Sequence, residues 1–256
     1  MHEDSTGCVI NVAYGDTAAC GLPVSQGVPL PRGMMCPGDR LAVVAPGGEW
    51  RPAAGRPLAQ WPDGSVRWLL VSFGAREAGT HRLVVNPDTV PTQPEVRLTQ
   101  VDGRWIIDSD RLHMVVCEAG PGILGELVCD GVPRLEHPGD LCLSVDDAST
   151  RYEQKRTVQV IESSPLRVRL RVSGQLVEAD GTCRLHYRLG IEIWAGWPAV
   201  RLDCHYFNLQ RGVPSMTVRR IALDSAWRLA AQTHRHFIQR AYGVFNVSRH
   251  VFNPGR

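Results

Sequence analysis

The segment PLRVRLRVSGQLVE, at residues 165–178, alternates apolar and polar side chains with a period of two. Its apolar positions include Leu166, Val168, Leu170 and Val172, and the positions between them carry Arg167, Arg169 and Arg171. A period of two is that of a β-strand, because successive side chains of a strand point to opposite faces. We therefore predict a long strand with one face in a core and the other face in water.

The remainder of the chain has a similar character. Short β-branched or aromatic runs are separated by Gly, Pro and Asp, a pattern typical of all-β folds. Further strands are predicted at 40–45, 65–73, 81–86, 104–108, 111–117, 157–163, 183–196 and 198–209. The segment 225–242 has an Ala-rich start that fits a helix, but the alternation of His234, His236, Ile238 and Arg240 favours a strand in its second half.

A boundary between two β units is predicted at NPDTVPTQPE, residues 86–95. Three prolines in ten residues, without apolar periodicity, indicate a stiff connector. The first unit then spans 8–88 and the second 95–256. The length of 256 residues is sufficient for two hydrophobic cores.

Composition limits the partners. Hydrophobic residues make up 43% of the chain and charged residues 21%, which is typical of a globular protein. The net charge of +2 does not favour nucleic acid, and no apolar stretch is long enough to cross a membrane. The N-terminal MHEDSTGC has no apolar segment of a secretory signal, which indicates the cytoplasm for a complete chain and leaves export open for a fragment.

No cofactor or metal is predicted. The closest pair among the eight cysteines is a dozen residues apart, so we expect reduced, buried thiols, with a disulfide conceivable only in an exported parent protein. His234 and His236 could hold a metal from one strand face, but no third ligand follows at a defined spacing. Phosphate-binding loops, dinucleotide-binding turns and the motifs of zinc proteases and serine hydrolases are absent from the sequence.

The stretch QWPDGSVRWLLVSF, residues 60–73, predicts a tight hairpin turn. Pro62 fixes φ, Asp63 can accept hydrogen bonds within the turn, and Gly64 can adopt a positive φ. Trp61 and Trp68 flank the turn and could stack on each other or on a sugar ring. The usual burial of tryptophan favours core positions for both.

These residues carry a family resemblance. The segment GVPLPRG at 27–33, Gln60, the segment WPDGS at 61–65 and Trp68 resemble the N-terminal RIFT-barrel domain of the PcRGLX/YetA-like family, named for a fungal exo-rhamnogalacturonan lyase. The resemblance covers residues 20–85 well. Later strands are similar in style to the central, galactose-mutarotase-like β-sandwich of this family. The implied fold is all-β: a small RIFT-type barrel followed by a large antiparallel β-sandwich.

The resemblance also implies a large α/α toroid after the sandwich. The sequence ends at VFNPGR without a helical repeat, so we expect an incomplete sandwich and a chain that is inactive without the missing helical domain. The catalytic residues of the family are not carried over to this chain. Candidate residues therefore come from the chemistry of the implied reaction.

A lyase acting on a uronate needs a group that neutralises the carboxylate, a base that removes the C5 proton and an acid for the leaving oxygen. The catalytic candidates are His205, Tyr206, Asn208, Arg211, His234 and His236, and the substrate-binding candidates are Arg32, Trp61 and Arg240. His205 shares a strand face with Arg201 and Asp203, so it is expected to point outward. The alternatives without a functional role are that His205 is solvated or paired with Asp203, and that Arg32 pairs with a local carboxylate.

Three functions follow. The favoured one is the N-terminal β portion of a polysaccharide-lyase-like protein that holds rhamnogalacturonan or another acidic polysaccharide. The second is a non-catalytic carbohydrate-binding module, which would expose Trp61, Trp194 and Trp197 in a row. The third is a sugar epimerase or mutarotase, which needs His205, His234 or His236 to share a cleft with a carboxylate.

Overall fold

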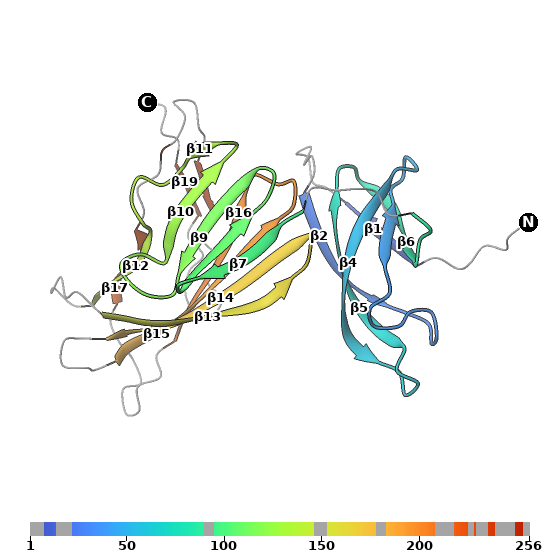
Figure 1. Cartoon of the computed structure of the whole chain (residues 1–256), viewed down its shortest axis with the longest axis horizontal. Coiled ribbons are helices and arrows are strands. Elements are labelled where there is room, and N and C mark those ends of the chain that lie inside the picture. The colour runs from blue at the N-terminus through green and yellow to red at the C-terminus, as the bar shows by residue number, and fades with distance from the viewer. Residues whose placement is uncertain are drawn as a thin grey trace, which may run out of the picture.

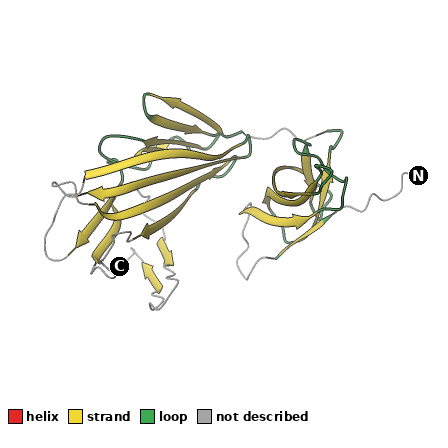
Figure 2. Cartoon of the chain, turned by 90° about the horizontal axis from the view of Figure 1, so that it is seen from below, coloured by secondary structure: helices red, strands yellow, loops and turns green. Residues whose placement is uncertain are grey.

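The computed structural model describes residues 8–13, 22–89, 95–145, 153–177, 183–207, 218–224, 228, 235–238 and 249–252. All regular structure in these ranges is β-strand, and every strand pairing is antiparallel (Figures 1 and 2). The all-β prediction is confirmed. Of the candidate helix at 225–242, only Arg228 and β18 (Arg235–Ile238) are described, and β18 has the strand conformation that the alternation favoured.

The N-terminal sheet has six strands in the order β1-β6-β3-β4-β5-β2. These are β1 (Val9–Val12), β2 (Leu22–Pro29), β3 (Leu41–Val44), β4 (Trp50–Gln60), β5 (Val66–Ala75) and β6 (Gly79–Val85). The sheet curls into a nearly closed barrel (Figure 2). Its seam lies between β1 and β2, where a cavity of about 630 Å³ is lined by both strands.

The barrel core is built from the alternation of its strands. In β5, Leu69, Val71 and Phe73 are fully buried, so the even-numbered Trp68 points outward and is 42% exposed. The core position expected for Trp68 is therefore wrong. Trp61 is half-buried, and its Nε1 donates to the Leu30 carbonyl at 3.2 Å.

The hairpin turn between β4 and β5 has the predicted chemistry. Trp61 N donates to Ser65 O at 2.8 Å, and Gly64 has a φ of 85°. The Asp63 carboxylate accepts from the Ser65 hydroxyl at 2.7 Å and from Arg32 Nε at 2.7 Å. The Ser65 hydroxyl oxygen also accepts from Gly33 N at 3.0 Å. The turn is thereby fastened to the GVPLPRG segment.

Two sheets face each other in the remaining chain (Figure 1). The five-stranded sheet has the order β11-β10-β9-β8-β7, and the four-stranded sheet has the order β13-β14-β15-β16. The first contains β7 (Arg97–Val101), β8 (Arg104–Asp108), β9 (Leu112–Cys117), β10 (Leu124–Cys129) and β11 (Val132–Pro133), and the second contains β13 (Glu153–Ser163), β14 (Arg167–Val177), β15 (Cys183–Trp194) and β16 (Val200–Phe207). Two further pairs join β12 (Asp140–Val145) to β17 (Val218–Asp224) and β18 to β19 (Arg249–Phe252).

The core between the two facing sheets confirms the alternation of the 165–178 segment. Val168, Leu170 and Val172 of β14 are buried against side chains of β8 and β9 such as Ile107 and Met114. This cluster shares no residue with the barrel cluster. The arginine face is not uniformly wet, however, because the Arg167 side chain is only 3% exposed. The wet-face prediction is wrong at that position, where the barrel covers the end of the sheet.

Two contacts on β13 and β14 hold this sandwich together. The buried Arg156 of β13 donates to the carbonyl oxygens of Cys117, Gly120 and Gly122, at 3.0, 2.6 and 3.0 Å. The ring of Tyr187 lies directly over Gly174 of β14, and burial raises the pKa of Tyr187 to about 12.

The five cysteines whose side chains are described, Cys8, Cys36, Cys117, Cys129 and Cys204, are free thiols. Cys36 and Cys204 are exposed, so the expectation of burial is wrong for these two. No helix in the described part of the chain is long and apolar enough to cross a membrane.

Replacing Ser65 by Ala should raise the pKa of Asp63. In the folded protein the Ser65 hydroxyl, and after it the Arg32 guanidinium, lower this pKa from 3.8 to about 2. Because the folded-state pKa lies below the ordinary one, the Asp63 carboxylate stabilises the folded protein at pH values above 3.8. This stabilisation is lost as the pH falls through about 2. NMR titration of the Asp63 carboxyl should show its pKa moving toward 3.8 in S65A. Asp39, whose pKa is lowered by the Cys36 amide, should not move.

Replacing Gly174 by Ala should destabilise the sandwich. The added Cβ would overlap the Tyr187 ring, and overpacking of this kind costs about 1–3 kcal/mol in the free energy of unfolding. The matched control is G190A in the neighbouring strand, where the new Cβ would meet Asp203 Cβ at an ordinary 3.6 Å. Urea denaturation of the two variants measures the difference, and equal stability would contradict the packing argument.

Candidate functional site

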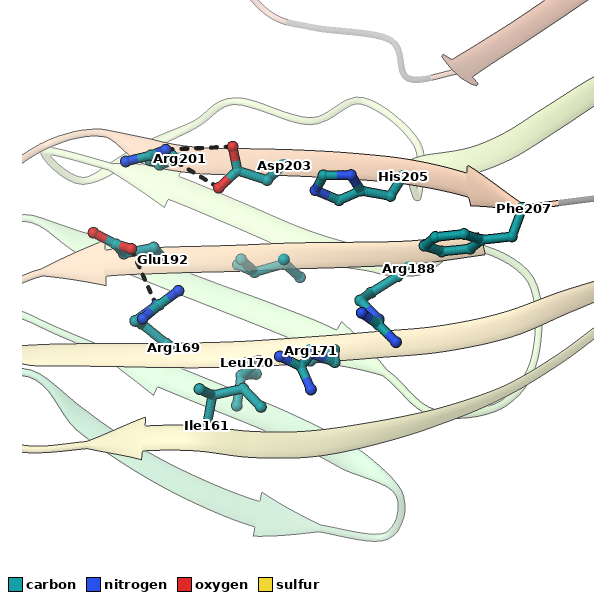
Figure 3. Close-up of a pocket in the computed structure, with 12 residues that line it drawn as sticks. Ile161, Arg169, Leu170, Arg171, Arg188, Glu192, Arg201, Asp203, His205 and Phe207 are labelled. Atoms are coloured by element: carbon teal, nitrogen blue, oxygen red, sulfur yellow. Dashed lines mark hydrogen bonds and ion pairs between the residues drawn. The ribbon is translucent and has the colours of Figure 1, made fainter. Parts of the chain in front are cut away.

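The face of the β13–β16 sheet that points away from the core carries the charged residues of these strands. The strand register places them in rows: Arg169, Glu192 and Arg201; then Arg171, Gly190 and Asp203; then Ser173, Arg188 and His205. Figure 3 shows Arg201, Asp203, His205 and Phe207 following one another along β16, with Arg188 beside them. The alternation that buries one face thus gathers arginines on the other.

A pocket of about 560 Å³ lies over these rows. It continues into a second pocket of about 550 Å³ that is lined by Gln175, His186 and Tyr187. The two pockets share Arg188 and Phe207, so together they form one elongated depression along the strands. We call this depression the outer groove.

The carboxylates of the outer groove are held by neighbouring cations. Asp203 pairs with Arg201 at 3.2 Å, and Glu192 pairs with Arg169 at 3.2 Å (Figure 3). The Trp194 indole also donates to Glu192 at 2.6 Å. Both carboxylates of the pocket shown in Figure 3 are therefore paired with arginines, while Arg171 and Arg188 also line it.

Arg171 and Arg188 have no carboxylate within ion-pair distance among the described residues. The guanidinium of Arg188 lies 5.5 Å from the centre of the Phe207 ring, a cation–π contact. The same Phe207 ring is nearly parallel to the ring of His205, with 6.5 Å between the ring centres and 19° between the ring planes. The groove therefore offers two unpaired guanidinium groups beside an aromatic ring and an imidazole.

This arrangement suits an anion with an apolar face. Guanidinium groups bind carboxylates with two parallel hydrogen bonds. The His205 imidazole lines the same groove and is a side chain of the type that serves as a general base. No group of three or more His, Cys, Asp and Glu side chains in the described ranges could hold a metal ion.

The structure places the sequence-predicted residues at separate points. His205 is exposed on the face of Arg201 and Asp203, as expected. Tyr206 lies on the opposite face, where it packs against the sandwich core. Arg32 pairs with Asp63 on the barrel, which is the local pairing that had been weighed for it, and it is 64% exposed. Trp61 carries the Arg67 guanidinium over its ring at 4.9 Å.

The other candidates give less. Asn208, Arg211, His234 and Arg240 lie outside the described residues, and His236 lies in β18 with its side chain outside them. Trp194 is 3% exposed and Trp197 is half-buried, so with Trp61 they do not form an exposed aromatic row. Sequence reasoning missed Arg171, Arg188 and Phe207 as neighbours. The sequence indicated only the alternation of arginines in the 165–178 segment. The sequence of one strand does not show how that strand is aligned with its neighbours.

Arg167 precedes Arg169 on the same face of β14 and joins the sandwich to the barrel. Its guanidinium pairs with Glu162 at 2.6 and 3.0 Å and donates to the Ser25 hydroxyl of the barrel at 2.8 Å. Ser25 in turn is bonded to Ser72 at 2.9 Å. The guanidinium also covers the Trp194 ring at 4.8 Å. We call this contact the junction.

Comparison with known proteins identifies the first part of the chain. Residues 13–88 match the model of the PcRGLX-like N-terminal RIFT barrel domain. The chain is also 28% identical over 113 residues to the "Uncharacterized protein YetA" of Bacillus subtilis (strain 168). That match covers 43% of this chain and only 13% of the Bacillus protein. The resemblance predicted from the GVPLPRG and WPDGS segments is confirmed.

Replacing Arg167 by Ala should destabilise the protein by about 3–5 kcal/mol, because it leaves the Glu162 carboxylate, whose side chain is only 13% exposed, without its cation. S25A keeps the Glu162 pair but removes the hydrogen bonds of Ser25 to Arg167 and to Ser72, and should cost about 2 kcal/mol. Chemical denaturation measures both. The control is R97A, whose 81%-exposed side chain pairs with Glu95 at 3.8 Å and should matter little. Equal stability of R167A and R97A would contradict the role of the junction.

Proposed function

We propose that this chain is the N-terminal, carbohydrate-binding β portion of a polysaccharide-lyase-like protein, and that it holds an acidic polysaccharide in the outer groove. Arg171 and Arg188 bind a uronate carboxylate, and Phe207 packs against the sugar ring. Turnover in this proposal depends on the helical toroid that the family resemblance implies.

The observation that carries the proposal is the pair of unpaired guanidinium groups beside an aromatic ring. Four arginines line the larger of the two pockets that form the groove, and the two carboxylates of that pocket are each engaged by one of them. An excess of cations on an otherwise nearly neutral protein is a specific local feature. The matched RIFT barrel model, a domain of a family named for an exo-rhamnogalacturonan lyase, supports a carbohydrate ligand.

The dependence on another domain follows from the chemistry of elimination. Arg171 or Arg188 can neutralise the uronate carboxylate, and His205 can accept the C5 proton. An acid for the leaving oxygen is also needed. The two carboxylates that line the groove, Glu192 and Asp203, are each engaged by a neighbouring arginine, so neither is placed to serve as that acid.

The alternatives find less support. A binding module built on Trp61, Trp194 and Trp197 lacks its aromatic row, since Trp194 is buried. A mutarotase would use His205 with a carboxylate, and His205 does share the groove with Asp203. Because Asp203 is paired with Arg201, it is not free to act as the partner of a catalytic histidine.

Replacing Arg171 by Gln should weaken binding of polygalacturonate about ten-fold, because a charge-assisted hydrogen bond contributes about 1.5 kcal/mol or more. Isothermal titration calorimetry measures the dissociation constant. R97Q, which removes an exposed arginine of the opposite sheet, is the matched control and should bind like the wild type. The affinity should fall with added salt.

The same samples test the second half of the proposal. The chain alone should bind polygalacturonate without forming the unsaturated product of elimination, which is followed by its ultraviolet absorbance. Loss of binding in both R171Q and R97Q would indicate non-specific charge attraction. Product formed by the wild-type chain would contradict the dependence on a further domain.

A further inference from the structure

We infer that the carbohydrate surface extends beyond the outer groove onto the barrel, where Trp68 forms a stacking platform for a second part of the same oligosaccharide. This inference rests on the proposed function. It adds a site on a different sheet and a minimum length for the ligand.

Trp68 lies on the outside of the barrel, with the Nε1 edge of its indole close to Gly27. A Cβ built on Gly27 of β2 would come within 2.8 Å of the indole Nε1 and within 3.5 Å of Cε2. The glycine therefore allows the ring to approach the backbone of the neighbouring strand. The outer side of the side chain stays open, with 42% of it exposed. An indole fixed in this way offers a flat apolar surface at little cost in side-chain freedom.

The residues that flank Trp68 on the neighbouring strands have small side chains. The strand register places Ala59 and Pro29 on either side of it, and the next row along the strands consists of Arg56, Leu70 and Gly27. Ala, Pro and Gly leave the ring standing clear of its neighbours, and Leu58, 45% exposed, extends the apolar surface. Arg56 is exposed in the adjacent row and adds a hydrogen-bond donor. Sugar rings bind to this combination, because their C–H faces pack on aromatic rings while their hydroxyl groups seek donors and acceptors.

The barrel surface and the outer groove meet at the junction. Ser72 lies on the same side of β5 as Trp68, four residues along the strand, and bonds to Ser25. Ser25 accepts from Arg167, which lies on the same side of β14 as Arg169 and Arg171. The contact between the two units is therefore made by the very side-chain faces that carry Trp68 and the groove arginines. In Figure 1, β2 of the barrel lies next to the end of β13 and β14.

The distances suit one extended ligand. Four residues of strand span about 13 Å, so Trp68 and Arg171 each lie about that far from the junction along their strands. A disaccharide held by Arg171 cannot also reach Trp68, whereas an oligosaccharide of several residues can. The ligand class is thus an extended oligosaccharide with at least one uronate, its charged part in the outer groove and another ring on Trp68.

A competing explanation is that Trp68 only covers Gly27. An aromatic side chain that shields a glycine of the neighbouring strand stabilises the sheet pair without any ligand. The two explanations differ in what the loss of the ring changes. Removal of a cover lowers stability alone, whereas removal of a platform lowers the affinity for long ligands and leaves that for short ligands unchanged.

The experiment measures dissociation constants of digalacturonate and hexagalacturonate with the whole chain by calorimetry. W68A should weaken hexagalacturonate binding about ten-fold and leave digalacturonate binding unchanged, and W68F should retain most of the affinity. The control is W50A, which removes a 41%-exposed tryptophan from β4 of the same barrel and should change neither constant. Thermal denaturation of each variant reports the loss of stability separately.

The outcomes separate the two proposals. If R171Q weakens both ligands while W68A weakens neither, the outer groove stands and the platform is wrong. If W50A weakens hexagalacturonate as much as W68A does, the effect is not specific to Trp68 and the platform is again wrong. If the wild type binds neither oligosaccharide, the proposed function fails and the platform fails with it.

Discussion

A buried positive charge sets the relation between the two halves of this protein. Arg167 has lost nearly all contact with water, so its charge must be compensated by nearby groups. Glu162 supplies two hydrogen bonds, and the barrel supplies one through Ser25. The barrel thus completes the coordination of a charge that belongs to the sandwich. Everything proposed for a surface shared by the two halves depends on this contact.

The separation of core from charged surface depends on the period of β14. Val168, Leu170 and Val172 face the hydrophobic cluster, and the arginines between them face outward. A shift of one residue in the pairing would place the guanidinium groups in the core and the aliphatic side chains in the groove. The cost of such a shift fixes the register of β13 to β16, and with it the positions of Arg171, Arg188 and His205.

Much of the architecture could be predicted from the sequence, because strands and turns are indicated by patterns within short segments. The WPDGS turn and the alternation at 165–178 are properties of a few consecutive residues. The strand β4 was missed, since Pro52 and Pro57 argue against a strand that is paired on both sides. Strand β4 accommodates this chemistry with an irregular register next to Pro57.

The candidate site was harder to predict, because it is formed across strands. His205 could be assigned to a polar face from β16 alone. Its neighbourhood with Arg188 and Phe207 depends on how β15 and β16 pair, and the burial of Arg167 depends on a residue 142 positions away in the barrel. Trp68 points outward because Leu69, Val71 and Phe73 occupy the inward-facing positions of β5. This alternation outweighs the usual tendency of tryptophan to be buried.

The way Arg156 holds the turn between β9 and β10 bears on how sequences related to this chain can diverge. Its guanidinium binds main-chain oxygens of Cys117, Gly120 and Gly122, and these oxygens are present whatever side chains the turn carries. Most substitutions in the turn therefore keep the contact. Gly120 and Gly122 are the exceptions, because both have a φ of 79°, and a Cβ on Gly122 would also collide with Pro138. Homologues should vary at the other positions of this turn while keeping the arginine and these two glycines, which makes the three residues a marker of shared ancestry where the rest of the sequence has drifted.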